Sequence, residues 1–236
     1  MVSPVKVTSE VPQTIYLKDY QKPDYLVESV DLVFEIKSAE QVVVISKLAM
    51  RRGENNGDGK VALVLNGSHL KLREVRLDGA ILPATRYQVT DKDLSIADLP
   101  QAFEIGTTIE INPKENLALE GVYTAGTVLC TQCEAEGFRR ITYFLDRPDV
   151  MAKYTVRLTA DSKTYPILLS NGNLKEETVL SDGRKTVLFV DPFPKPSYLF
   201  ALVAGNLNFI RDTFQTKSGR KVSLEISYGR GIEKRW

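Results

Sequence analysis

One short block of the sequence, residues 131–135, places an amide and a carboxylate two residues apart. If this block is extended, Gln132 and Glu134 project from one side of the chain while Cys133 projects from the other. An amide oxygen beside a carboxylate can accept several hydrogen bonds, which suits an ammonium group with three donors and no acceptor. The α-amino group of a peptide, with a pKa of about 8, is mostly protonated at neutral pH. The spacing therefore indicates a candidate site for the amino terminus of a peptide.

The same block also has an ordinary structural interpretation. Arg139 and Arg140 follow it closely, so Glu134 could instead form a salt bridge with either arginine at a solvated strand edge. Residue types and spacing do not decide between a binding site and a surface ion pair.

Cys130 and Cys133 are the only two cysteines, and they form a C-x-x-C pair. A zinc ribbon needs a second pair of ligands, and a redox C-x-x-C lies at the start of a helix, whereas this segment is typical of a strand. Three residues of extended chain span about 10 Å, more than the ~7 Å that a disulfide tolerates. We expect two reduced, structural thiols.

His69 is the only histidine, and it limits the chemistry that the chain can perform. An H-E-x-x-H zinc site needs two histidines, and the G-x-S-x-G elbow of a serine hydrolase is absent from the sequence. His69 follows an Asn-Gly turn, which favours an exposed loop histidine, so a free-standing hydrolase using it is possible only in principle. We therefore predict no catalytic residue and no metal ligand in this chain.

Composition narrows the partners. The 31 lysines and arginines nearly balance the 30 aspartates and glutamates, giving a net charge of +1, so no overall field favours nucleic acid or an anionic membrane. The longest apolar run, 198–205, is far shorter than the roughly 20 residues that span a bilayer. The first residues lack the apolar region of a secretory signal. We expect a cytoplasmic protein with no nucleic-acid or membrane partner.

Short apolar runs, many of them alternating, recur along the chain. The run at 32–36 is an example, and turns rich in glycine and asparagine separate such runs. No window longer than about ten residues shows a helical apolar repeat. These patterns predict an all-β fold, an antiparallel β-sandwich of several packed sheets with very little helix. We expect one domain, residues 19–236, after a flexible N-terminal arm, residues 1–18.

Three segments carry more local predictions. Alternation over 139–145 favours a strand. The segment 147–152 is the best candidate for a short helix, because Pro148 suits a first helical turn. Three prolines in 191–197 cannot donate hydrogen bonds to a sheet, so this segment is expected to be a rigid connector rather than a strand.

Longer blocks of the chain resemble the N-terminal domain of the aminopeptidase N family of zinc-dependent gluzincin aminopeptidases. The resemblance extends over nearly the whole chain from Lys18 onwards. The blocks that carry it are "KDYQKPDY" (18–25), "LEGVY" (119–123), "CTQCEAEGFRRITYFLDRPDVMAKY" (130–154), "YPILLSNGN" (165–173), "DPFPKPSYLFALVAG" (191–205) and "DTFQTKSGRKVSLEI" (212–226).

The resemblance implies a saddle-shaped all-β domain packed beside a thermolysin-like catalytic domain. It implies that Gln132 and Glu134 help to bind the free amino terminus of a peptide substrate. The complete enzyme would use zinc to hydrolyse the first peptide bond. The family's zinc motif is absent from this sequence, so we expect the zinc and the catalytic groups beyond residue 236, none bound to this chain, and no activity from the chain alone.

One alternative from a different functional class stays open. A β-sandwich of this kind could be a non-enzymatic interaction or scaffold module, which should keep its apolar surfaces covered. A domain separated from its catalytic partner should instead expose the face that meets that partner.

Overall fold

The computed structural model describes residues 14, 16–56 and 61–229. Strands dominate this part of the chain, and its helices are 3₁₀ turns of three or four residues, so the prediction of an all-β fold with very little helix is confirmed. Most of the predicted arm, 1–18, lies outside the described residues. The strands are β1 (Tyr25–Ile36), β2 (Val42–Arg52), β3 (Leu63–Asn66), β4 (Lys71–Leu77), β5 (Ala80–Ile81), β6 (Tyr87–Val89), β7 (Asp93–Ile96), β8 (Ala102–Ile111), β9 (Gly121–Ala125), β10 (Val128–Gln132), β11 (Ala152–Asp161), β12 (Ile167–Ser170), β13 (Asn173–Val179), β14 (Arg184–Lys195), β15 (Leu202–Gly205), β16 (Leu207–Gln215) and β17 (Lys221–Gly229). The 3₁₀ turns are η1 (Leu17–Asp19), η2 (Glu54–Asn56), η3 (Ala84–Arg86), η4 (Gly137–Arg140) and η5 (Ser197–Leu199).

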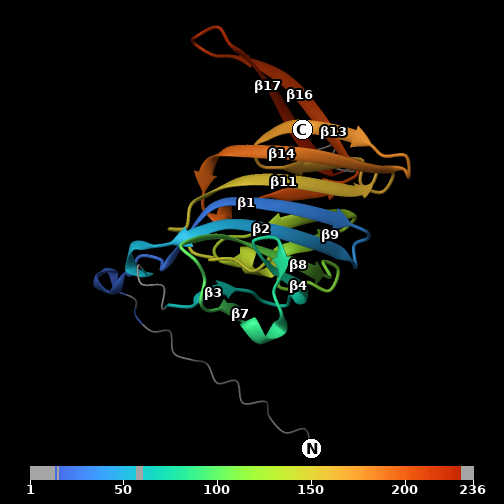
Figure 1. The fold of residues 1–236 in the computed structure, drawn as a ribbon. Helices are drawn as coiled ribbons and strands as arrows, with labels where there is room; N and C mark the ends of the chain where they lie inside the picture. The colour runs from blue at the N-terminus through green and yellow to red at the C-terminus, as the bar shows by residue number, and fades with distance from the viewer. Residues whose placement is uncertain (1–13, 15, 57–60, 230–236) are drawn as a thin grey trace, which may run out of the picture.

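An eight-stranded sheet forms the frame of the molecule, in the order β13-β14-β11-β1-β2-β8-β4-β5. Its long strands lie side by side in Figure 1. Neighbouring strands are antiparallel except β1 and β11, which pair in parallel from Ser29↔Lys153 to Ile36↔Ala160. Strand β1 forms because its side chains alternate between the core and the other face, and Val30, Leu32, Phe34 and Ile36 are all buried.

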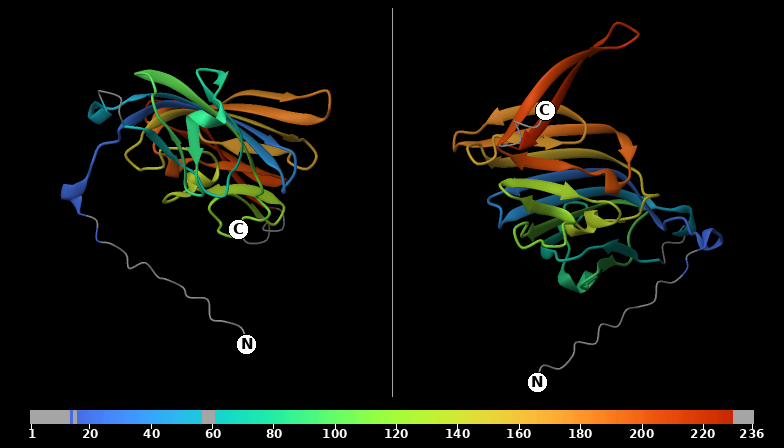
Figure 2. Two further views of the ribbon diagram at one scale, coloured as in Figure 1. Left: turned by 60° about the horizontal axis from the view of Figure 1, so that its bottom comes forward. Right: turned by 180° about the vertical axis from the view of Figure 1, so that it is seen from behind.

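A four-stranded sheet, ordered β12-β15-β10-β9, forms a second layer (Figure 2). Aromatic side chains fill the space between the layers. Phe34 of the large sheet stacks on Phe200, just before β15, with ring centroids 6.0 Å apart. Tyr154 of β11 meets the edge of Phe138 in η4, at 6.2 Å. The core thus lies directly beneath the segment that follows β10. A third sheet, β3-β7-β6, completes the body.

The ribbon formed by β16 and β17 is a separate two-stranded sheet that projects from the body (Figures 1 and 2). Residues paired across an antiparallel ribbon share a face, and the faces alternate along each strand. The pairs Ile210↔Ile226 and Phe214↔Val222 therefore lie on one face, to which the pair Asp212↔Leu224 between them also belongs. Ile210, Phe214, Leu224 and Ile226 are exposed. The other face carries the Arg211–Glu225 ion pair.

The structure corrects three local predictions. The segment 139–145 is not a strand: it contains the end of η4 and a loop with one bridge, Asn66↔Phe144. Its residues 141–144 are buried one after another, because layers pack on both sides of them, whereas a surface strand alternates. The expected helix at 147–152 is a single turn at Pro148 and Asp149, where the Arg147 guanidinium binds the Asp149 carboxylate and β11 begins at Ala152.

The proline-rich segment is also different from the expectation, since β14 runs on to Lys195. Its partners explain how. The pairing of β14 with β11 breaks between Asp191 and Lys195, so the two prolines at 192 and 194 fall in an irregularity where no ladder donor is needed. Lys195 then holds the end of the strand in place, because its ammonium group lies 3.7 Å from the centroid of the Tyr154 ring and 3.0 Å from the Asp191 carboxylate.

Candidate functional site

Gln132 and Glu134 lie at the end of β10 and in the turn that follows it. Gln132 is the last residue of β10 and pairs with Gly121 of β9. The extended conformation considered for residues 131–135 ends at Gln132. No strand pairs with the chain beyond that residue. Instead the Cys133 carbonyl accepts a hydrogen bond of 2.8 Å from the Gly137 amide, which closes a turn over 134–136.

The two candidate side chains lie on either side of a buried residue at this turn. Gln132 and Glu134 are exposed, and the Cys133 side chain between them is only 1% exposed. Burial, and secondarily the negative charge of Asp146, raises the pKa of the Cys133 thiol to about 12. Both cysteines are free, as expected from their spacing. The Cys133 side chain therefore packs into the hydrophobic core as an apolar residue, between two exposed polar residues.

The acidic residues around the turn differ in their partners. Glu120 accepts from the Arg140 guanidinium at 3.0 Å, and Glu136 lies 2.8 Å from that of Arg139. Within the described part of the chain, no lysine or arginine forms an ion pair with Glu134. The salt bridge from Glu134 to Arg139 or Arg140, the ordinary alternative from the sequence, is therefore wrong. Glu134 keeps an exposed carboxylate that a cationic ligand can bind without displacing a described side chain.

Asp146 holds the base of the turn in place. Its carboxylate is fully buried and accepts hydrogen bonds from the Arg139 amide (3.0 Å), the Arg139 side chain (3.1 Å) and the Ser197 hydroxyl (2.6 Å). A buried carboxylate is tolerable only with such partners. Because Arg139 belongs to η4 and Ser197 to η5, this single group joins the turn after β10 to the connection after β14.

A hydroxyl cluster fixes the loop after η4 to the large sheet. Ser46 of β2, Thr107 of β8 and Thr142 of the loop contact one another at 2.8 to 3.2 Å, and all three are buried. Phe138 packs against Phe144 and Phe200, with centroids 5.0 and 5.3 Å away. Side chains thus clamp the segment 138–146 from several directions, so the turn that carries Glu134 stands on a packed base.

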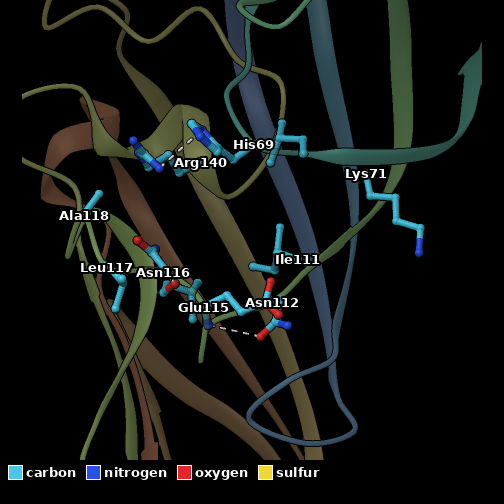
Figure 3. A pocket seen from close by; sticks show the side chains of 11 residues that line it. His69, Lys71, Ile111, Asn112, Glu115, Asn116, Leu117, Ala118 and Arg140 are labelled. Atoms are coloured by element: carbon cyan, nitrogen blue, oxygen red, sulfur yellow. Dashed lines mark hydrogen bonds between the residues drawn. The ribbon is translucent and has the colours of Figure 1, made fainter. Parts of the chain in front are cut away.

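A cavity of about 560 Å³ lies beside this region without including Gln132 or Glu134. Its lining combines the loop after β8, including Asn116 and Leu117, with His69 and Arg140 (Figure 3). His69 is exposed in a loop, as predicted; its Nδ1 lies 2.8 Å from the Ser68 hydroxyl and 3.4 Å from the Arg140 guanidinium. The lining mixes basic with acidic and apolar side chains, which selects no ligand class, so we do not assign the cavity a ligand.

The residues that hold the turn were not predicted from the sequence. Asp146 is one, and the glycines of two Glu-Gly pairs, Gly121 and Gly137, are others. A Glu-Gly pair lies on each side of the Gln132 block, and these pairs could have indicated the two glycines. Glycine is the usual residue where two backbones approach closely.

Residues that could hold a metal were also tested. Among the described residues, no group of three or more histidines, cysteines, aspartates or glutamates is arranged to bind a metal ion. The thiol of Cys133, the most suitable soft ligand near the turn, is buried and stays protonated at neutral pH. The described residues thus do not fit the zinc that the family resemblance implies.

Comparisons with known proteins agree with the resemblance noted from the sequence. The chain is 47% identical over 223 residues to aminopeptidase N of Escherichia coli, and 47% identical over 218 residues to aminopeptidase N of Caulobacter vibrioides. These matches cover 94% and 92% of this chain. The chain spans about a quarter of the length of each of these relatives, 25% in both cases.

Solved structures give the same picture. Legionella pneumophila aminopeptidase A, determined in complex with aspartic acid, matches with a TM-score of 0.83 and 38% identity, over 89% of this chain and 25% of that one. An M1 zinc metallopeptidase variant from Deinococcus radiodurans, bound to a Tyr-Ser-Ala substrate, matches with a TM-score of 0.73 over 88% of this chain and 48% of that one; at 18% identity it shows the fold alone. Residues 29–199 match the Peptidase M1 N-terminal domain, and the chain belongs to that family.

Proposed function

We propose that this chain is the N-terminal domain of a zinc aminopeptidase that removes the first residue from peptides, and that Gln132 and Glu134 bind the substrate's α-amino group. One observation carries the assignment of the site. Glu134 presents an exposed carboxylate with no cationic partner among the described residues, while arginines neutralise its neighbours Glu120 and Glu136. A substrate ammonium group is the natural complement of that charge.

The contribution of the two residues is placement. Fixing the ammonium end of a peptide determines which bond reaches the catalytic groups, so the enzyme acts one residue from the end. The described residues do not fit a zinc site, so in this proposal the rest of the longer enzyme holds the metal and supplies the catalytic groups. The chain alone should then be inactive.

The ribbon of β16 and β17 supports a partner for the chain. Its exposed apolar face, built around Ile210, Phe214, Leu224 and Ile226, needs a cover. The curated relatives are about four times as long as this chain, which matches 25% of each. In this proposal the catalytic part of the same polypeptide covers that face.

The proposal places the enzyme in the cytoplasm, acting on peptides rather than on nucleic acid or membranes. The two cysteines are free rather than paired, which suits a reducing compartment. The nearly balanced charge offers no field for polyanions. The described part of the chain contains no helix long and apolar enough to cross a membrane.

The test is a Glu134→Gln substitution in the complete enzyme, assayed with an amino-acyl p-nitroanilide. Charge-assisted hydrogen bonds contribute about 1.5–3 kcal/mol, so kcat/KM should fall about 10- to 100-fold, mainly through KM. The matched control is Glu136→Gln, an exposed carboxylate two residues away that already has an arginine partner. The control should stay within about twofold of the parent enzyme, because surface ion pairs contribute little. An unchanged kcat/KM in Glu134→Gln would refute the anchoring role.

A further inference from the structure

We propose that Gly137 is a positioning residue for substrate binding: its missing side chain lets η4 close on the backbone of Gln132 and so sets where the Gln132 amide stands. This inference rests on the proposed function and deepens it, because it names a residue that acts on the anchor without touching the substrate. Gly137 is buried, follows the turn that carries Glu134, and begins η4.

The contact between Gly137 and Gln132 leaves no room for a side chain. A Cβ atom on Gly137 would lie 2.6 Å from the carbonyl oxygen of Gln132 and 3.1 Å from the amide nitrogen of Gly121. Both are backbone atoms, which cannot swing away as the end of a long side chain can. Because the φ angle of Gly137 lies outside the left-handed region, the backbone itself would accept an alanine here. Close approach is therefore the reason that the position needs glycine.

Gly121 repeats this arrangement on the neighbouring strand. It pairs with Gln132 in the β9–β10 register and has a φ of +70°. A Cβ on Gly121 would lie 2.7 Å from the Cβ of Arg140. Gly137, the first residue of η4, thus lies against Gln132, and Arg140, the last residue of η4, lies against Gly121, which pairs with Gln132. We call these two contacts the glycine seam.

An ion pair also joins the two sides of the seam. The Arg140 guanidinium at the end of η4 binds Glu120, the residue before Gly121, at 3.0 Å, and both side chains are partly exposed. Arg140 also lies beside His69 on the wall of the neighbouring cavity (Figure 3). The ion pair spans the same two segments as the contact between Gly121 and Arg140, so it joins η4 to the start of β9, where Gly121 pairs with Gln132 of β10.

A side chain at Gly137 would force a shift where η4 meets the backbone of Gln132, because real Cβ atoms do not sit 2.6 Å from an oxygen. Displacements of about 1 Å in a positioned group cost about 100-fold in rate. A smaller displacement of the anchor should raise the KM for substrates with a free amino terminus about tenfold. The kcat should change little, because in the proposed function the catalytic groups belong to another part of the enzyme.

The experiment compares Gly137→Ala with Gly53→Ala in the complete enzyme. Gly53 is a matched control: a Cβ there would lie 2.5 Å from the Pro23 carbonyl oxygen, its φ is also outside the left-handed region, and its contacts are with the start of β1. Both variants should lose similar thermal stability. Only Gly137→Ala should show the rise in KM for an alanyl p-nitroanilide with kcat retained. Equal KM values in the two variants would overturn the inference.

Glu134→Gln is measured in the same series. Its result distinguishes a failure of the proposed anchor from a failure of the positioning role of Gly137. A rise in KM for Glu134→Gln with none for Gly137→Ala rejects the seam and leaves the proposed function standing. No effect of Glu134→Gln rejects the proposed function and the inference with it. If Gly137→Ala does not fold, Glu120→Ala, which removes the ion pair across the seam, should raise KM more than Glu136→Ala does. Equal effects of those two variants would also overturn the inference.

Discussion

Cys133 shows how a single residue can set the direction of its neighbours. Its thiol is buried beside Asp146 while Gln132 and Glu134 on either side of it are exposed. The burial that keeps the thiol protonated also fixes the backbone from which the two polar side chains project. Cys130, by contrast, is partly exposed on β10.

The two cysteines should therefore differ in reactivity. In the native protein at pH 8, iodoacetamide should modify Cys130 and leave Cys133 largely unmodified, because only the thiolate reacts and burial raises the pKa of Cys133 to about 12. Mass spectrometry of the labelled peptides would measure this. In denaturant both thiols should react, and Cys130→Ser should abolish labelling of the folded protein. Equal labelling of both cysteines in the native state would show that the turn opens.

The sequence indicated how side chains alternate along the Gln132 block, but not which residues contact one another. The spacing predicted that Gln132 and Glu134 project from one side and Cys133 from the other if the block is extended. In the structure the first two are exposed and Cys133 is buried, but the chain turns after Gln132. The spacing could not show that the strand ends at Gln132, because that depends on which segments lie beside β10. Nor could it show that Arg139 and Arg140 bind Glu136, Asp146 and Glu120, since several carboxylates were equally near in the sequence.

Strand predictions from the sequence were right where one face of the strand is buried. They were wrong where the segment is packed on both sides. β1 alternates, and its part at 32–36 was predicted from that alternation. The segment 141–144 is buried throughout, and its residues read as a strand because apolar side chains alone do not distinguish a strand from a packed loop. The prolines of β14 led to a wrong prediction for a different reason. The pairing with β11 is interrupted at these prolines, so no backbone N–H is needed there.

The ribbon of β16 and β17 leaves several large apolar side chains exposed on one face. Its apolar face should bind the dye ANS when this chain is produced alone, and should favour self-association. Ile226→Asp should reduce both, because it places a charge on that face. Ser223→Asp adds the same charge to the opposite face and should change neither. Fluorescence titration and sedimentation velocity would measure the effects.

The outcome also separates the two functional classes considered from the sequence. A complete interaction module with covered surfaces should give a monodisperse monomer without dye binding. Such a result for this chain would contradict the role proposed for the ribbon, whereas dye binding that disappears on adding a separately produced catalytic part would support it.

For the whole molecule, surface carboxylates set the response to acid. Hydrogen bonds from Arg73, Lys71 and Gln41 lower the pKa of Glu110 from 4.5 to about 2. A carboxylate whose pKa is lower in the folded state stabilises the fold above its unfolded pKa, and this contribution is lost as the pH falls through the folded value. Stability should therefore decline as the pH falls from about 4.5 to about 2.

Glu110→Gln tests this dependence. Chemical denaturation at several pH values should show a shallower loss of unfolding free energy between about pH 4.5 and pH 2 than in the parent protein. Glu54→Gln, which removes a carboxylate with one lysine partner, should flatten the slope less. An identical acid slope in Glu110→Gln and the parent would show that other carboxylates control the transition.

The parallel pairing of β1 with β11 has a consequence for synthesis on the ribosome. The stretch 37–151 must leave the exit tunnel before β11 can meet β1, whereas β1, β2 and β8 can associate earlier. Strand β10 becomes fully paired later still, because its second neighbour, β15, begins at Leu202. The proposed amino-terminus anchor is thus among the last parts of this domain to be secured, and a nascent chain released before residue 202 would carry Gln132 on a strand with one side unpaired.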